Sequence, residues 1–374
     1  MVSRRRISGV AVAGGLAAVL AIGAAGCGSS GGDNGGSSSS GGGGGGGGGA
    51  KIAFLLPENK TARYEAQDKP DFIAAVKQLC AQCSVIYNNA NQDAARQQQQ
   101  AEAAIANGAK VLVIDAVDVK SATSIVSSAK QAHVPVIAYG RLIPNADLNY
   151  YISIDPYRVG QQQARRLLTA LGGGQGKRVV MINGSPTDSN SAPYKNGALN
   201  IFKAAGVKVV KSYDTPDWSP DKAQTEMDQA ITALGKNGFD AVYVANDGMA
   251  SGAIAALKAA GIDPKTKPVT GQDAELDGVQ RILTGEQLMT VYQPIEQIAK
   301  TAARLAVPLA QSKTPPAIAT AKVDNGAEKV PSALLDTVVV DSHNVDSVVK
   351  AGFLTTKQIC TGPYAKACAK TGLT

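Results

Sequence analysis

The sequence predicts an α/β protein whose parallel sheets are covered by helices on both faces. From Lys51 onward, short apolar runs that read as buried strands alternate with helical segments of ordinary length. Continuous apolar strands separated by helices are typical of parallel sheets, because each crossover helix covers one face of the sheet. A chain of 374 residues has room for two such domains, each with a sizeable core.

The first 50 residues read as an export and tethering segment. Arg4–Arg6 precedes an apolar stretch, Val10–Ala25, and an Ala-Ala-Gly-Cys sequence that ends at Cys27 and resembles a lipoprotein cleavage box. We therefore expect residues 1–26 to be a signal peptide and Cys27 to carry a lipid. The alternative is an ordinary signal peptide followed by an incidental cysteine. Residues 27–50 are almost all Gly and Ser and cannot bury apolar surface, so a disordered tether is expected.

The apolar runs and their boundaries place the remaining elements. A Gln/Ala-rich helical stretch, for example, ends at Asn107-Gly108, a typical helix stop. The predicted strands are Lys51–Leu56, Ser84–Tyr87, Val111–Ile114, Pro135–Tyr139, Arg178–Ile182, Val207–Ser212, Ala241–Ala245, Val269–Gly271 and Leu288–Tyr292. The predicted helices include Asp71–Leu79, Asp93–Ala106, Ser121–Gln131, Arg165–Leu171 and Tyr194–Ala205.

Composition argues against several classes of protein. The formal charge is +7, or +4 without the three arginines at positions 4–6, and no basic stripe interleaved with aromatic residues suggests nucleic acid. The chain has two histidines, His133 and His343, far apart in sequence, which disfavours most metal sites and His-based catalytic sets. A Gly-rich stretch at 172–178 lies after a helix and before a strand, the reverse of a phosphate-binding loop. No cofactor or metal is predicted.

Four cysteines remain in the exported part of the chain, and an even number there indicates disulfides. Three pairings are possible, and we favour the local pairs Cys80–Cys83 and Cys360–Cys368. A Cys-x-x-Cys sequence also occurs in redox enzymes, where it normally begins a helix. Here it ends a helix and precedes a strand, so the structural interpretation is favoured.

Candidate binding residues, most of them polar or aromatic, recur in the segments that follow the carboxyl ends of the predicted strands. They are Glu58, Asn59, Arg63, Tyr64, Asp115, Asp118, Gly140, Arg141, Asp188, Asn190, Trp218, Asn246, Asp247, Asp273 and Gln293. Each alone is as well explained by a turn or a helix cap. Their recurrence at the carboxyl ends of strands, where open α/β sheets bind ligands, favours one cleft for a neutral, hydroxyl-rich molecule. Carboxylates, amides and guanidinium groups can each form hydrogen bonds to two adjacent hydroxyls, and Trp or Tyr can pack on the C–H face of a sugar.

Several of these segments carry a family resemblance. From Lys51 to about Phe353 the chain resembles the type I periplasmic sugar-binding proteins of ABC importers, most closely the D-xylose-binding branch. The most specific segments are Ala138-Tyr-Gly-Arg-Leu-Ile, Tyr151-Ile-Ser-Ile-Asp with Val159-Gly160, Gly184-Ser-Pro-Thr-Asp-Ser-Asn, Ala245-Asn-Asp, Thr270-Gly-Gln-Asp-Ala-Glu-Leu and Met289-Thr-Val-Tyr-Gln-Pro-Ile.

The resemblance implies two doubly wound parallel-sheet lobes joined by three hinge crossovers, with the sugar bound between them. It places the N-terminal lobe at 51–154 with 294–314 and the C-terminal lobe at 155–293 with 315–374. The expected hinges are near Ser153–Pro156, Tyr292–Pro294 and about Lys313–Ala317. The tail after Phe353 extends beyond the resemblance, and its segment Thr355–Cys368 is expected to fold over one lobe through the Cys360–Cys368 link.

The resemblance also implies which residues bind the sugar. Polar contacts are implied for Arg63, Arg141, Asp188, Asn190, Asn246 and Asp273, and aromatic packing for Trp218 and for Tyr64, which stands where the family has a tryptophan. Two positions depart from the family: Gly140 replaces an aspartate before the arginine, and Gln293 replaces a lysine before the proline. Gly140 is expected to leave space that could admit a hexose. Equally, a water molecule and Gln293 could restore the lost contacts, in which case the ligand would still be a pentose.

The function expected from the resemblance is that of a substrate-binding lipoprotein, not an enzyme. It would be a monomer on the outer face of the cytoplasmic membrane or in the periplasm, with a monosaccharide and ABC permease subunits as partners and membrane contact through its lipid. One alternative is a sugar sensor that presents its ligand to a membrane receptor. A secreted glycosidase using two of Asp188, Asp247 and Asp273 is the other, and it would need carboxylates with separated pKa values.

Overall fold

The computed structural model describes residues 49–373. The predicted signal peptide, the lipidation of Cys27 and nearly all of the predicted tether lie outside the described residues. Within the described range, no helix is both long enough and apolar enough to span a membrane.

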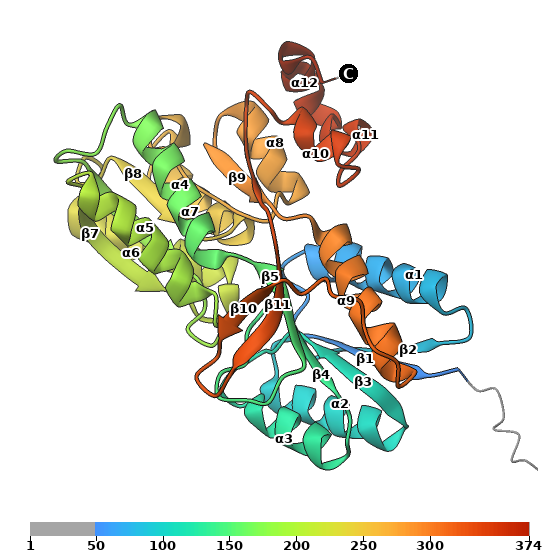
Figure 1. Ribbon diagram of the computed structural model, residues 1–374. Coiled ribbons are helices and arrows are strands. Elements are labelled where there is room, and N and C mark those ends of the chain that lie inside the picture. The colour runs from blue at the N-terminus through green and yellow to red at the C-terminus, as the bar shows by residue number, and fades with distance from the viewer. Residues whose placement is uncertain (1–48, 374) are drawn as a thin grey trace, which may run out of the picture. The chain divides into compact units, whose positions relative to one another are not determined.

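Strands and helices alternate along the described chain, as the apolar runs predict (Figure 1). The strands are β1 (Lys51–Leu56), β2 (Ser84–Asn89), β3 (Ala109–Ile114), β4 (Val136–Tyr139), β5 (Tyr150–Ile154), β6 (Arg178–Asn183), β7 (Lys208–Asp214), β8 (Ala241–Val244), β9 (Met289–Tyr292), β10 (Ala321–Asp324), β11 (Lys329–Leu335) and β12 (Val338–Asp341). The α-helices are α1 (Lys69–Leu79), α2 (Ala94–Ala106), α3 (Thr123–Gln131), α4 (Pro156–Ala170), α5 (Ser191–Ala204), α6 (Pro220–Leu234), α7 (Asp247–Ala259), α8 (Leu276–Thr284), α9 (Ile295–Ala310), α10 (Asp346–Lys350), α11 (Thr356–Ile359) and α12 (Ala365–Thr371). A π-helical turn, η1 (Tyr64–Asp68), precedes α1, and short 3₁₀ turns are η2 (Pro216–Trp218), η3 (Pro264–Thr266) and η4 (Gly362–Tyr364).

The first lobe is built on a seven-stranded sheet with the order β10-β11-β5-β4-β3-β1-β2. All neighbouring pairs are parallel except β10 and β11. Helices α1 and α9 pack together on one face, and α2 and α3 pack together on the other (Figure 1). The apolar strands are therefore buried on both sides, and Phe54 of β1 stacks on Phe72 of α1 with ring centroids 4.2 Å apart.

The second lobe has a parallel sheet with the order β7-β6-β8. A parallel bridge from Val242 to Val269 extends it, and the antiparallel pair β9–β12 follows through a hydrogen bond from the Leu288 N–H to the Val269 oxygen (2.8 Å). Helices α4 and α5 pack together, as do α6 and α7. The expected fold of two doubly wound lobes is confirmed.

Three crossovers join the lobes. The chain passes from β5 to α4 at Asp155 and from β9 to α9 at residues 293–294, where hinges are predicted. The third crossover is at residues 336–337, between β11 in the first lobe and β12 in the second. The predicted hinge at 313–317 and the assignment of all of 315–374 to the second lobe are therefore wrong. The reason is that β11 pairs with β5 and keeps residues 321–335 in the first sheet.

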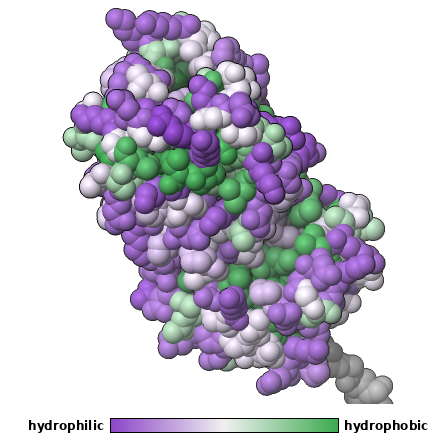
Figure 2. All heavy atoms as spheres, turned by 90° about the vertical axis from the view of Figure 1, so that its left-hand side faces the viewer, coloured by the Kyte–Doolittle hydropathy of each residue, from purple (hydrophilic) through white to green (hydrophobic). Residues whose placement is uncertain are grey.

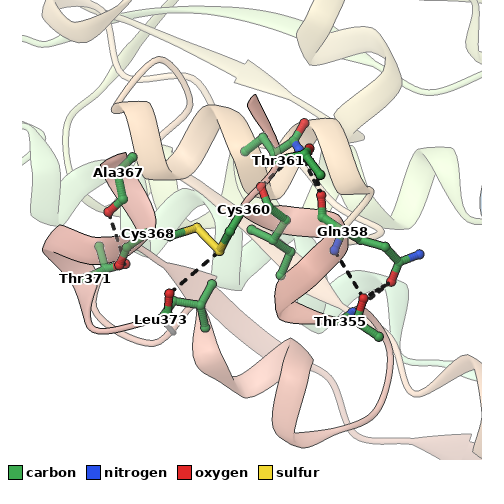
Figure 3. The surroundings of a disulfide bond; sticks show 10 residues. Thr355, Gln358, Cys360, Thr361, Ala367, Cys368, Thr371 and Leu373 are labelled. Atoms are coloured by element: carbon green, nitrogen blue, oxygen red, sulfur yellow. Dashed lines mark hydrogen bonds between the residues drawn. A yellow bond between two sulfur atoms is a disulfide. The ribbon is translucent and has the colours of Figure 1, made fainter. Parts of the chain in front are cut away.

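Both predicted local disulfides, Cys80–Cys83 and Cys360–Cys368, are present among the described residues. Cys80 ends α1 and Cys83 precedes β2, which agrees with a structural role. The segment after β12 folds against α8, where the Gln280 side chain donates a hydrogen bond to the Ile359 carbonyl (3.1 Å). Figure 3 shows the second disulfide in this tail, with the capping box between Thr355 and Gln358 that begins α11.

Polar side chains cover most of the face of the molecule that Figure 2 shows, and apolar ones gather in smaller patches. Few large apolar side chains of the described range are exposed, and they are Ile73, Leu79, Tyr157, Leu334 and Val338. The largest fully buried side chains belong instead to the two lobe cores, with Phe54, Phe72 and Tyr139 in the first lobe.

Glycines let the helices of the second lobe pack closely. A Cβ atom on Gly197 of α5 would lie 2.1 Å from the backbone oxygen of Tyr157 in α4, and one on Gly160 would lie 1.9 Å from the oxygen of Tyr194. Because these obstacles are backbone atoms, a larger residue forces the two helices apart.

Replacing Gly197 by Ala is expected to lower the free energy of unfolding by about 1–3 kcal/mol, because the added methyl group overpacks the α4–α5 contact. Chemical denaturation followed by circular dichroism measures the change. The matched control is Gly248→Ala in α7, where the nearest atoms to an added Cβ are 3.8 Å away. Equal stability of the two variants would contradict the role of Gly197.

Candidate functional site

A cavity lies where the carboxyl ends of the strands of the two lobes face each other. It contains about 520 Å³ of space free of protein atoms, a volume that includes open space at its mouth. It is lined by Thr61, Arg63, Tyr64, Asp115, Gly140, Arg141, Ser153, Asp188, Asn190, Tyr194, Trp218, Asn246, Gln272, Asp273, Gln293 and Ile298.

All ten residues that the family resemblance proposes for sugar binding line this one cavity. Of the other candidates after the strands, Asp115 also lines the cavity, whereas Asp118 and Asp247 do not. The Asp118 carboxylate accepts the Ser121 N–H (2.8 Å) in a turn before α3, and Asp247 is fully buried beneath α8 and β9. Turn and cap roles thus explain part of the recurrence, as expected for Asp and Asn.

Arg141 connects the two lobes at the floor of the cavity. Its Nε lies 2.9 Å from the Asp188 Oδ2 in the second lobe and 3.3 Å from the Asp115 Oδ1 in the first, and all three side chains are at most 5% exposed. Its Nη1 donates to the Ala116 carbonyl (2.7 Å). Although burial lowers it, the pKa of Arg141 is raised overall by these carboxylates, so the guanidinium stays charged.

A second polar chain crosses between the lobes at Gln293. Both oxygens of Asp68 accept from Arg63, at 2.8 Å each, and the Arg63 Nη1 donates to the Gln293 Oε1 (3.2 Å). The Gln293 Nε2 then donates to the Asp273 Oδ1 (2.7 Å). An amide serves this position because it accepts from one neighbour and donates to the other, which a lysine cannot do.

Aromatic side chains form two walls of the cavity. The Trp218 Nε1 donates to the Asp188 Oδ2 (3.2 Å), and Tyr194 meets the Trp218 ring edge-on with centroids 6.4 Å apart. On the other side, the Arg63 guanidinium lies 5.3 Å from the Tyr64 ring centroid. Trp218 and Asp273 both have left-handed backbone angles, with φ of 52° and 92°, and such strain is typical of binding sites.

Gly140 does not leave free space, and that expectation is wrong. Its φ is +72°, and a Cβ atom built on it would lie 2.5 Å from the Asp115 Oδ2. The neighbouring strand thus supplies a carboxylate at the place where a side chain at 140 would extend. The Gly140 carbonyl accepts from Ser153 Oγ (2.7 Å) and from Asn190 Nδ2 (3.0 Å), so it also links the lobes.

Sequence reasoning missed several lining residues and one supporting residue. Ser153, Tyr194 and Gln272 line the cavity, and Asp68 holds Arg63 from below. Asp115 appears among the residues that follow strands, but the family resemblance does not select it. A polar residue at the end of an otherwise apolar strand was the available indication for Asp115 and Ser153. Asp68 had none, because it lies inside a polar segment at the end of a π-helical turn.

Asp247 has no free oxygen for chemistry. Its Oδ1 accepts from Gln287 (2.6 Å), and its Oδ2 accepts from the Glu275 N–H (2.9 Å) and from Thr290 (2.8 Å). These contacts fasten α7 to α8 and β9. Among residues 49–373, no cluster of three His, Cys, Asp or Glu side chains is placed to hold a metal ion.

Comparison with known proteins identifies the family. Residues 52–314 match the model of the periplasmic binding protein domain. The chain is 36% identical to the D-xylose-binding periplasmic protein of Escherichia coli, over 81% of this chain and 90% of that protein. It is 35% identical to the multiple sugar-binding periplasmic receptor ChvE of Rhizobium radiobacter, over 70% of this chain and 78% of that protein.

A solved structure shows the same fold. It is an ABC transporter solute-binding protein from Clostridium phytofermentans with bound β-D-glucose, with a TM-score of 0.74 and 28% identity over 83% of this chain and 99% of that one. The chain belongs to the periplasmic binding protein family.

Replacing Asp68 by Ala is expected to lower the free energy of unfolding by about 3 kcal/mol or more, because Arg63 would keep a buried charge without its partner. Urea denaturation measures the loss. The control is Asp147→Ala, which breaks an ion pair with Lys130 whose side chains are 59% and 69% exposed, and which is expected to cost less than about 1 kcal/mol. Similar losses in both variants would show that the Arg63–Asp68 pair does not stabilise the site.

Proposed function

We propose that this member of the periplasmic binding protein family is the substrate-binding protein of a carbohydrate ABC importer. It captures a monosaccharide between its lobes and delivers it to a membrane permease. The observation that carries the proposal is the lining of the cavity, where both lobes contribute carboxylate, amide or guanidinium groups beside Trp218 and Tyr64. The relatives bind D-xylose, several sugars or glucose according to their names, which supports an uncharged sugar here.

Hinge closure at the three crossovers is the proposed mechanism. In the structure the lobes already meet through Arg141 with Asp188, Asn190 with the Gly140 carbonyl, and Arg63 with Gln293. A sugar that contacts both lobes has more interactions in the closed form than in the open one, so it favours closure. The permease would recognise the closed form.

Binding needs no chemical step, and we propose that the protein is not an enzyme. The Asp188 oxygens already accept from the Asn190 N–H (2.8 Å) and from Trp218 (3.2 Å), and the Asp273 Oδ1 accepts from Gln272 and Gln293. Carboxylates held in this way orient ligand hydroxyls. A glycosidase would instead need one of the pair free as a nucleophile or base.

The relatives are named as periplasmic proteins, and we propose that this chain also acts outside the cytoplasm. Cys27 would carry the lipid that holds it at the outer face of the cytoplasmic membrane, with the Gly/Ser segment as a tether.

A monosaccharide panel tests the binding function. D-Xylose, D-glucose, D-galactose and D-ribose are added to the protein, and at least one, with D-xylose expected first, should raise the melting temperature. A sugar at 100 times its Kd adds about 2.7 kcal/mol to the free energy of unfolding. Sucrose at equal concentration controls for general stabilisation by excluded solutes. The absence of any specific shift, or hydrolysis of a nitrophenyl glycoside, would contradict the proposal.

The same panel decides between a pentose and a hexose pocket. Tight binding of D-xylose without any hexose, measured by calorimetry, would show that the cavity selects a pentose although Gln293 replaces the lysine of the family.

Replacing Cys27 by Ala is expected to move the protein from the membrane fraction to the soluble extracytoplasmic fraction, because the lipid attachment atom is lost. Fractionation followed by immunoblotting measures the distribution. An unchanged membrane fraction for the variant would contradict the proposal that a lipid on Cys27 anchors the protein.

A further inference from the structure

The Asp115 carboxylate is buried beside Arg141, and among the described residues one of its oxygens accepts no hydrogen bond. It follows β3 directly, it is 1% exposed, and it lines the cavity. Its Oδ1 has no hydrogen-bond partner among the described residues. A buried acceptor without a donor loses its hydration with no compensation, so such groups mark places where a further molecule binds.

The backbone holds Asp115 firmly in this place. Its N–H donates to the Leu55 carbonyl (2.9 Å) and its own carbonyl accepts from the Gln97 side chain (2.8 Å). These bonds fix the backbone of Asp115 at the end of β3, next to the cavity. Because β3 and β4 are parallel neighbours, positions 115 and 140 project into one space. A Cβ atom on Gly140 would lie only 2.5 Å from the Asp115 Oδ2, which leaves room for one side chain only.

The unpartnered oxygen lies next to an unpartnered donor. The Arg141 Nε is 3.3 Å from the Asp115 Oδ1 and 2.9 Å from the Asp188 Oδ2, yet its N–H is aligned with neither oxygen. A hydroxyl group donates one hydrogen bond and accepts others, so it fits between an acceptor and a donor. A purely cationic or anionic ligand group would satisfy one of the two and repel the other.

We propose that Asp115 is a specificity-determining residue of this cavity and accepts a hydrogen bond from a ring hydroxyl of the bound monosaccharide. The inference rests on the proposed function. In this proposal, the carboxylate that contacts the sugar comes from Asp115 at the end of β3. Gly140 at the end of β4 leaves room for it.

The charges around Asp115 give this contact a pH dependence. The titratable and charged groups around it are Arg141, Asp188, Arg63, Asp68, Tyr64, Tyr139 and Tyr151. Burial is the main cause that raises the pKa of Asp115 to about 7, against the attraction of Arg141. A sugar hydroxyl that donates to the carboxylate favours its ionised form, so sugar affinity is expected to rise about tenfold between pH 6 and pH 8.

Calorimetry with the tightest-binding sugar of the panel tests the inference. Asp115→Asn is expected to weaken binding at least about tenfold, since hydrogen bonds to charged groups are the strong ones, and to flatten the pH dependence. Asp118→Asn, three residues along and outside the cavity, is the matched control and should bind as the wild type does. Adding Gly140→Asp to Asp115→Gly should restore part of the affinity that Asp115→Gly alone loses, because Asp tolerates a left-handed backbone.

Each outcome separates the two proposals. Wild-type protein that binds a sugar, with Asp115→Asn equally tight and equally pH-dependent, overturns the role of Asp115 and leaves the proposed function intact. Wild-type protein that binds no sugar overturns both. If Asp115→Asn does not fold, Asp115→Ser and the wild-type pH profile decide: unchanged affinity of the Ser variant, or a flat wild-type profile, overturns the inference.

Discussion

The buried contact between Arg141 and Asp188 is the interaction on which the closed structure depends. It joins a guanidinium from the end of β4 to a carboxylate from the loop after β6, with both side chains nearly inaccessible. Charges this deeply buried are stable only when they are paired, so each lobe needs the other or a ligand to complete its site. The cavity is therefore both the proposed binding place of the sugar and the place where the two lobes are held together.

The remaining polar groups follow from the same constraint. Gln293 joins Arg63 to Asp273 with one amide, and Trp218 donates to Asp188 while it presents an apolar ring to the cavity. Few donors and acceptors are then left unpaired, and those of Asp115 and Arg141 stand side by side. A site built in this way is prepared for hydroxyl groups, because a hydroxyl satisfies a donor and an acceptor at once.

The fold and the location of the site could be predicted from the sequence because the carboxyl ends of parallel strands meet at one edge of a sheet. That rule brings Arg63, Asp188 and Trp218 to one cavity although they are far apart in sequence. The rule does not reveal which side chains from neighbouring strands occupy the same space. The space beside Gly140 depends on Asp115 of the next strand, and the sequence shows neither that contact nor the pairing of β11 with β5.

Trp218 is the only tryptophan of the chain, and it lines the cavity, so its fluorescence reports directly on the central claim that a sugar binds between the lobes. The decisive measurement is a titration of Trp218 emission with the monosaccharide that gives the strongest calorimetric signal. We expect a saturable change in emission with the same Kd as the calorimetric titration. Binding heat without any change in Trp218 emission would place the sugar elsewhere and contradict the account.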